Sequence, residues 1–179
     1  MNINRVFSTP ERVLILNHII FETESINVNQ IANETKTSKG LVSKYLKILK
    51  EEDILKKTDQ TYQVIPSSAS KAVKILLNLS KIDCRIFQET PAIISAGLFG
   101  SAVNGANTKE SDIDIWILHN QISPEGLSKI TKRLLVIGDT KPVYLTIDKV
   151  NELRERDPVF YYSLIFGSIV LYGEHLDAL

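Results

Sequence analysis

The stretch LFGSAVNGANTKESDIDIWIL, Leu98 to Leu118, decides the fold of the second half of this chain. It contains the pair Gly100-Ser101 and, after ten intervening residues, the pattern Asp112-x-Asp114 at the head of an apolar run. Because side chains alternate along a strand, the two aspartates share one face, about 7 Å apart at Cα, while the isoleucines between and after them face a core. Two carboxylates at this spacing suit a divalent cation such as Mg²⁺, which prefers carboxylate and phosphate oxygens.

The segment before the aspartates, IISAGLFGS, predicts a buried strand that runs into a tight turn. Backbone N–H groups at such a turn, with the Ser101 hydroxyl, would form a pocket for an anion. The pattern is not a Walker motif, because no lysine follows the last glycine. A simpler interpretation is that Asp112 caps a turn and Asp114 is exposed at a strand end. The fixed spacing from Gly100-Ser101 favours a site for a metal ion and phosphate.

This spacing resembles the signature of the minimal nucleotidyltransferases of the DNA polymerase beta superfamily. The segment DPVFYYSLIFGSIVLYGE also resembles that family's closing helix and strand, so the likeness covers about residues 86–174. It implies an α/β (α+β) nucleotidyltransferase fold with a mixed sheet, binding Mg²⁺ and an NTP such as ATP. By the same resemblance, Gly100 and Ser101 contact phosphate, and Asp112 and Asp114 are catalytic residues that ligate the metal.

Two features depart from the family pattern. The family carries a third carboxylate on a later strand, as general base and ligand of a second metal ion, and the matching segment KPVYLTID has Tyr144 in its place. Tyrosine, with a pKa of about 10, is a poor base at neutral pH. Loss of a positioned base typically costs about 10²–10⁴ in rate. In addition, Ala102 and Asn104 stand where many relatives have arginines, so the resemblance implies a weaker hold on triphosphate.

The N-terminal segment has the element order of a winged helix-turn-helix domain, which is mostly α. Apolar spacing predicts helices over residues 10–21, 27–35 and 38–51, followed by two short strands about Thr58-Asp59-Gln60. The order resembles small bacterial and archaeal regulators over Pro10 to Ile65. In such modules the third helix enters the major groove of double-stranded DNA and the hairpin touches the backbone. The resemblance implies DNA contacts by Lys39, Ser43, Lys44, Lys47, Lys56 and Lys57.

The charges of this segment leave alternatives open. Residues 1–66 hold nine basic residues against eight acidic ones, which is a small excess for a duplex binder. A lysine-faced helix is also compatible with a solvated face or with protein docking. A homodimer would double the footprint on DNA.

The cluster PSSAS at residues 66–70 marks a predicted joint. We therefore predict a winged helix-turn-helix domain at 1–66, an inter-domain helix at 67–85 and a nucleotidyltransferase-like domain at 86–179. No apolar run reaches the roughly 18 residues of a membrane span, and no signal pattern is visible, so we expect no membrane association and a cytoplasmic location. Cys84 is the only cysteine, which excludes an internal disulfide.

Two functions are compatible with these features. The first is a DNA-binding regulator whose nucleotidyltransferase-fold domain binds Mg-NTP, with catalysis impaired by the missing third acid. The alternative is an active enzyme that transfers NMP to a protein or small-molecule acceptor. The arrangement also resembles antitoxin members of the superfamily, which modify a partner toxin, so a protein partner is compatible with both.

Overall fold

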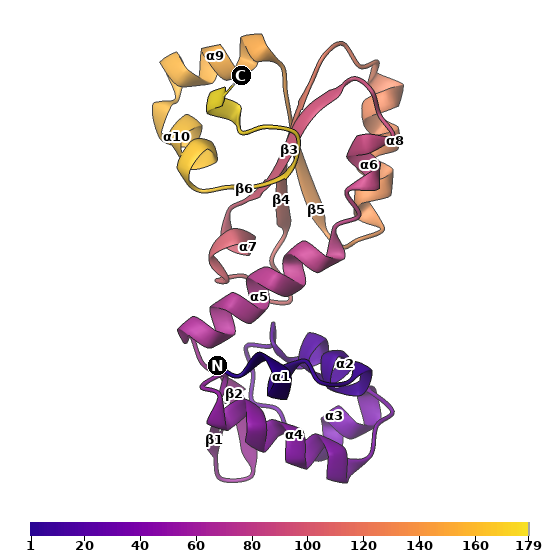
Figure 1. Cartoon of the computed structure of the whole chain (residues 1–179), viewed down its shortest axis with the longest axis vertical. Coiled ribbons are helices and arrows are strands. Elements are labelled where there is room, and N and C mark those ends of the chain that lie inside the picture. Colours follow the sequence, from indigo (N-terminus) through magenta and orange to yellow (C-terminus); the bar gives the residue numbers. More distant parts are fainter. Residues whose placement is uncertain (179) are drawn as a thin grey trace. The chain divides into compact units, whose positions relative to one another are not determined.

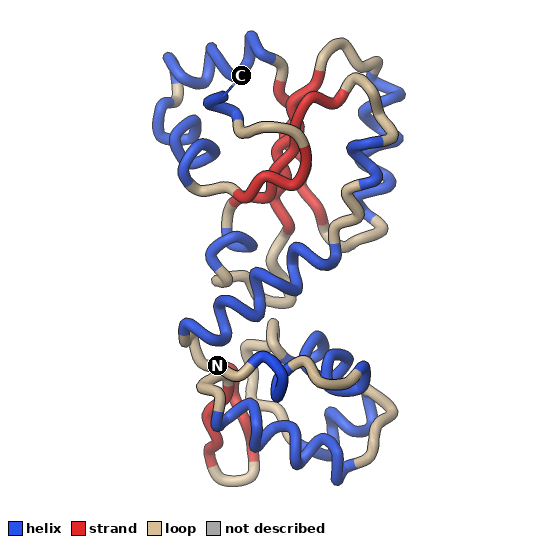
Figure 2. The backbone as a smooth tube through the Cα atoms, in the orientation of Figure 1, coloured by secondary structure: helices blue, strands red, loops and turns tan. Residues whose placement is uncertain are grey.

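The computed structural model describes residues 1–178, which form two compact units. The first contains Met1–Leu77 together with Gly105–Glu110, and the second contains residues 78–104 and 111–178. Figures 1 and 2 show the helices and strands of each unit. The helix expected after the predicted joint is α5 (Ser68–Lys81), and its residues up to Leu77 belong to the first unit. No helix within residues 1–178 has both the length and the apolar character that crossing a membrane requires.

The first unit has the predicted helix-turn-helix order followed by a hairpin. Its elements are α1 (Ile3–Val6), α2 (Pro10–Ile19), α3 (Val28–Glu34), α4 (Lys39–Glu51), β1 (Leu55–Thr58) and β2 (Thr61–Val64). The side chains of Thr9, Asn27 and Ser38 each accept a hydrogen bond from a backbone N–H in the first turn of the following helix. These caps satisfy donors that a helix N-terminus leaves without an intrahelical partner, which fixes where each helix begins.

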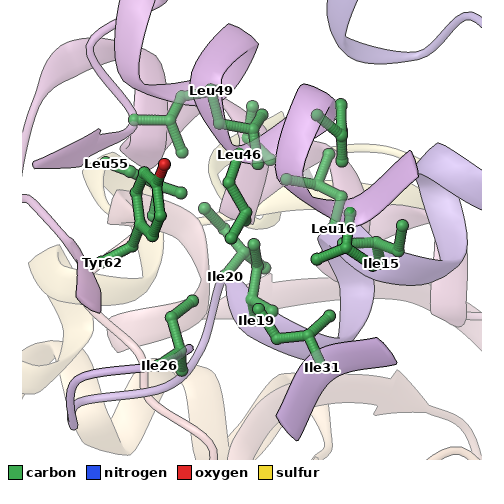
Figure 3. Packing of buried hydrophobic residues seen from close by; sticks show 14 of the residues in the cluster. Ile15, Leu16, Ile19, Ile20, Ile26, Ile31, Leu46, Leu49, Leu55 and Tyr62 are labelled. Atoms are coloured by element: carbon green, nitrogen blue, oxygen red, sulfur yellow. The ribbon is translucent and has the colours of Figure 1, made fainter. Parts of the chain in front are cut away.

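The core of this unit joins all its main elements. Figure 3 shows side chains of the helices and of the hairpin packed together, among them Ile15 and Leu16 of α2, Leu46 of α4 and Tyr62 of β2. Ile26 forms an isolated antiparallel bridge with Tyr62, which ties the segment before α3 to the wing. The apolar faces that the spacing predicts for α3 and α4 are buried, whereas on α2 the spacing places Leu14 on the apolar face and the structure leaves it half exposed and buries Ile15.

The segment Gly105–Glu110 lies between the Gly-Ser turn and the aspartate strand in sequence but packs in the first unit. The backbone N–H of Lys109 donates to Phe21 O at 2.9 Å, and its ammonium pairs with Glu22 at 2.9 Å. Lys74 Nζ donates to Asn107 O at 2.7 Å. The segment is therefore held by the contact of Asn107 with α5 and by the contacts of Lys109 with the residues just after α2.

The second unit is built on a four-stranded sheet of order β5-β4-β3-β6. The strands are β3 (Ile93–Phe99), β4 (Ile113–His119), β5 (Thr140–Leu145) and β6 (Ile169–Tyr172). Strand β3 is antiparallel to β4 and β6, whereas β4 and β5 are parallel, so the predicted mixed sheet is confirmed. The helices are α6 (Arg85–Gln88), α7 (Ser101–Asn104), α8 (Pro124–Leu135), α9 (Ile147–Arg156), α10 (Pro158–Phe166) and the 3-10 turn η1 (Leu176–Ala178).

Each face of the sheet is covered by helices, and alternation along β4 divides its side chains between them. Ile113, Ile115 and Ile117 belong to the core formed with α6 and α8. Trp116 and Leu118 belong to the core formed with α9, α10 and η1. Figure 1 shows these helix groups on opposite sides of the strands. The aspartates lie on the second face, because they alternate with the isoleucines.

Candidate functional site

The Gly-Ser turn and the aspartate strand meet at one edge of the sheet. Strand β3 ends at Phe99, which is paired with Asp114 in the antiparallel ladder, so the turn begins directly beside that carboxylate. Gly100 has φ 72°, in the left-handed region that glycine adopts without penalty. A β-carbon at Gly100 would overlap Asp114 Oδ2, so the turn is closed onto the carboxylate and leaves no room for a side chain.

The short helix α7 follows the turn and begins at Ser101. Its position is fixed by Asn78 of α5, which is fully buried and whose Nδ2 donates to Ala102 O at 2.9 Å. Within the described residues the Ser101 hydroxyl has no hydrogen-bond partner, which leaves it able to bind an added anion. Asn104 ends the helix. At Ala102 and Asn104, where many relatives have arginines, this chain brings no positive charge to the turn.

Strand β5 adds a cation to this site. In the parallel ladder Lys141 is paired with Asp114, and paired residues of a parallel ladder point to the same face. Lys141 Nζ forms an ion pair with Asp112 Oδ2. The Lys141 side chain is 64% exposed and that of Asp112 is 30% exposed, so solutes can reach the pair from solvent.

The two carboxylates have opposite electrostatic environments. The bonded ammonium of Lys141 lowers the pKa of Asp112 below its ordinary value. Burial, together with the negative charge of Asp112, raises the pKa of Asp114. The bond to Asp112 in turn raises the pKa of Lys141, which keeps the lysine charged. The site therefore holds one carboxylate that a bonded ammonium stabilises and one that the charge of Lys141 compensates only in part, and a further cation would relieve the second.

Tyr144 lies on the opposite face of the sheet, which corrects its predicted placement beside the aspartates. It pairs with Ile117, and its hydroxyl donates to Leu127 O at 3.1 Å and lies 2.8 Å from Thr131 Oγ1 of α8. The error comes from the strand register, because a shift of one residue moves a side chain to the other face. On the face of Asp114, β5 presents Lys141 and Val143, so this strand brings no carboxylate to the site.

The donor set fits a divalent cation only if phosphate completes it. In the part of the chain that the structure describes, no group of three or more His, Cys, Asp or Glu residues is arranged to hold a metal ion. Two carboxylates, an unpartnered serine hydroxyl and a turn without a β-carbon do match Mg²⁺, which is commonly bound by one or two carboxylates plus substrate phosphates.

A cavity of about 370 Å³ lies along β5, lined by Val143, Tyr144 and Leu145 of this strand and by neither aspartate. Val143, two residues after Lys141 and on the same face, lines it together with Leu153 of α9 and Phe160 of α10. The charged groups of Lys149, Glu152 and Arg156 also line the cavity. Phe160 contacts Phe99, the residue paired with Asp114, at a ring-centroid distance of 6.1 Å. An apolar floor with charged groups around it is typical of pockets for small molecules.

Trp116 is fully buried although it shares the aspartates' face. Its ring covers Gly97, its partner in the ladder, and a β-carbon at Gly97 would overlap the indole. The tryptophan therefore fills the sheet surface and is not available to stack on a ligand.

The residues predicted to contact DNA lie on α4 and on the first strand of the wing. The lysines among them are exposed, whereas Ser43 is partly buried; the set is Lys39, Ser43, Lys44, Lys47, Lys56 and Lys57. The opposite face of α4 is buried through Val42, Tyr45, Leu46 and Leu49. The lysine face is thus the outward face of a helix whose orientation is fixed by its core contacts.

Comparison with known proteins gives a family match in each of the two parts of the chain. Residues 81–176, more than half of the 179, match the family described as polymerase beta, nucleotidyltransferase. The chain belongs to this nucleotidyltransferase family. Residues 9–57 match the family described as bacterial regulatory protein, arsR family. A regulator's helix-turn-helix domain and a nucleotidyltransferase-fold domain are thus joined in one chain, as the resemblances predicted.

Among solved structures the chain resembles a toxin-antitoxin with AMP-PNP, at 22% identity and a TM-score of 0.41 over 56% of this chain and 77% of that chain. It also resembles a mutant of the toxin-antitoxin MntA-HpeT, at 18% identity and a TM-score of 0.38, covering 52% of this chain and 72% of that one. A second mutant of that pair gives 22% identity and a TM-score of 0.37, covering 52% and 71%. A search of curated proteins gave no match.

Lys141 is the site residue that the sequence analysis missed. The sequence signal that could have found Lys141 is its position at the start of the segment KPVYL. It lies three residues before Tyr144, so the two side chains point to opposite faces of the strand. Only the parallel pairing with β4 shows that this other face is the one that carries the aspartates.

Proposed function

We propose that this protein is a DNA-binding regulator whose nucleotidyltransferase-fold domain binds a metal–nucleoside triphosphate complex, and that its capacity for nucleotidyl transfer is impaired. The observation that carries the proposal is the composition of the site face. Asp112 and Asp114 stand beside the Gly100 turn, while β5, the strand on which the resemblance implies a carboxylate, presents Lys141 on the site face.

In this proposal Asp112 and Asp114 hold the divalent cation, and the cation supplies charge neutralisation for the triphosphate. The Ser101 hydroxyl and the backbone of the Gly100 turn bind phosphate oxygens. The cavity beside Val143 offers an apolar surface for the base, with Lys149 or Arg156 at its rim. Transfer to an acceptor needs removal of the acceptor's proton, and strand β5 places no carboxylate on the site face to accept it. The nearest further carboxylate is that of Asp139, which interacts with Asp112 from the loop before β5.

The nucleotide half of the proposal is tested by titrating the whole protein with Mg·ATP in a calorimeter. We expect one binding event in the unaltered protein, and its loss when Asp112→Asn and Asp114→Asn are combined. A control with Glu155→Gln removes an exposed carboxylate of α9 that lines neither the aspartate pair nor the cavity, and it should retain binding. Binding that persists in the double variant would show that the nucleotide occupies another place.

The DNA half is supported by the outward lysine face of α4 and by the family match of residues 9–57. We expect Lys44→Glu combined with Lys47→Glu to abolish binding to a duplex in an electrophoretic mobility assay. Binding by the unaltered protein should weaken steeply as salt rises, because phosphate contacts release counterions. The matched charge reversal Lys129→Glu with Lys132→Glu, on exposed positions of α8, should leave binding intact. Duplex binding that does not weaken as the salt concentration rises would contradict the DNA half of the proposal.

The alternative, an active transferase, is favoured by one observation, namely that the Gly-Ser turn and both aspartates do come together. Incubation with Mg²⁺ and ATP labelled at the α-phosphate separates the two functions. Label that reaches a protein or small-molecule acceptor in the unaltered protein and not in Asp112→Asn would show that transfer does not need the family's third carboxylate. We expect transfer to be absent or slow, and to increase in Lys141→Asp, which places a carboxylate on the site face.

A further inference from the structure

Lys141 is fixed to the candidate site by the sheet itself. Its neighbours Thr140 and Pro142 pair with Ile113 and Ile115, so its backbone is held in register next to Asp114 along an uninterrupted parallel ladder. The side chain has only to extend over the carboxylates, and its ammonium reaches Asp112.

The charge balance of the site depends on this lysine. Besides Asp112 and Asp114, the side chain of Asp139, the residue before β5, interacts with Asp112 and Lys141, so three carboxylates and one ammonium leave two negative charges. One divalent cation balances these two charges, and the ammonium is available to a phosphate group once the cation has taken its place at the carboxylates.

We propose that Lys141 is a positioning and specificity-determining residue: it pairs with Asp112 as long as no metal is bound and passes to the triphosphate when a metal–nucleotide complex binds. This inference rests on the proposed function. It follows that the site takes one divalent cation and discriminates between free metal and metal bound to nucleotide. Free metal must compete with the ammonium for Asp112 and offers it no other anion. A metal–nucleotide complex brings phosphate oxygens to which the ammonium can move.

The proposal predicts opposite effects of one substitution on two ligands. We expect Lys141→Met, which keeps the length of the side chain and removes its charge, to raise the affinity for free Mn²⁺ by roughly threefold to tenfold. The same substitution should lower the affinity for Mn·ATP by roughly the same factor. Both constants can be measured on the full chain by electron paramagnetic resonance of free Mn²⁺, without any assay of activity.

Two control variants separate charge from other effects. Lys141→Arg retains the positive charge and should restore values close to those of the unaltered protein for both ligands. Lys132→Met makes the same chemical change at an exposed position of α8 and should change neither constant. Lys141→Gln provides a second neutral variant and should behave as Lys141→Met does.

The results distinguish a failure of this inference from a failure of the proposed function. If neither the unaltered protein nor Lys141→Met binds Mn·ATP, the proposed nucleotide site is wrong, and this inference with it. If the unaltered protein binds Mn·ATP but the neutral variants shift both affinities in one direction, or shift neither, only the role of Lys141 is refuted. Two Mn²⁺ ions per bound nucleotide in the unaltered protein would refute it as well.

Discussion

The substitution Gly100→Ala tests the close approach of the turn and the carboxylate on which the candidate site depends. Gly100 has φ 72°, and a β-carbon there would overlap Asp114 Oδ2. The added methyl group has two consequences. First, a left-handed backbone conformation is unfavourable for a residue with a β-carbon. Second, either the Asp114 carboxylate moves away from the turn or the turn opens.

The expected size of the effect follows from these two terms. A left-handed conformation costs a residue with a β-carbon about 1–2 kcal/mol. The carboxylate is the end of a side chain and can rotate away from the added methyl group. The overlap therefore changes the free energy of unfolding little, but it displaces the carboxylate from its place in the site. For a chain of this size a loss of that order lowers Tm by roughly 2–8 °C. Because Asp114 is displaced, we expect the affinity for Mg·ATP to fall by roughly tenfold or more.

Thermal denaturation followed by circular dichroism and calorimetric titration with Mg·ATP measure the two effects. Gly40→Ala is the matched control, since Gly40 lies in α4 and a β-carbon there meets no atom within 4 Å. In a helix this change stabilises by up to about 1 kcal/mol, so Tm should rise, and nucleotide affinity should stay constant. A Gly100→Ala protein with the stability and affinity of the unaltered chain would refute the tight turn and the site built on it.

Two further predictions concern the two faces of the sheet. Tyr144→Phe removes the hydroxyl that bonds to Thr131, so we expect a loss of about 1 kcal/mol in stability by denaturant titration and no change in Mg·ATP affinity; a large loss of affinity would place Tyr144 at the site after all. Asp114→Asn should raise Tm at pH 7 by a few degrees, roughly 1–4 °C, because burial and the charge of Asp112 raise the pKa of Asp114. The folded protein therefore holds the proton of Asp114 more tightly than the unfolded chain does, and ionisation of this carboxyl destabilises the fold as pH rises above its ordinary pKa of 3.8. The gain in Tm from Asp114→Asn should vanish when pH falls below that value. A gain that is equal at acidic and neutral pH would contradict this origin.

Local patterns predicted the three longer helices and the hairpin of the first unit, but not its short helix α1. Ser38 and Asn27 are helix caps in the structure, and the wing turns at Asp59, whose φ of 53° is a conformation that aspartate tolerates. Each of these depends on a few neighbouring residues. By contrast, helix α8 was not predicted, although Ser123 caps it.

The sequence by itself determined the parts of the site that one segment carries: the turn at Gly100, the common face of Asp112 and Asp114, and the core face of the isoleucines between them. These follow from backbone sterics and from the period of two along a strand. The tertiary structure alone decided which face of β5 meets the aspartates. It brings Lys141 to them and turns Tyr144 toward α8. The physical reason is that the hydrogen bonds of a parallel ladder set the register between β4 and β5, two strands separated by a whole helix, and a change of one residue in that register exchanges the two faces.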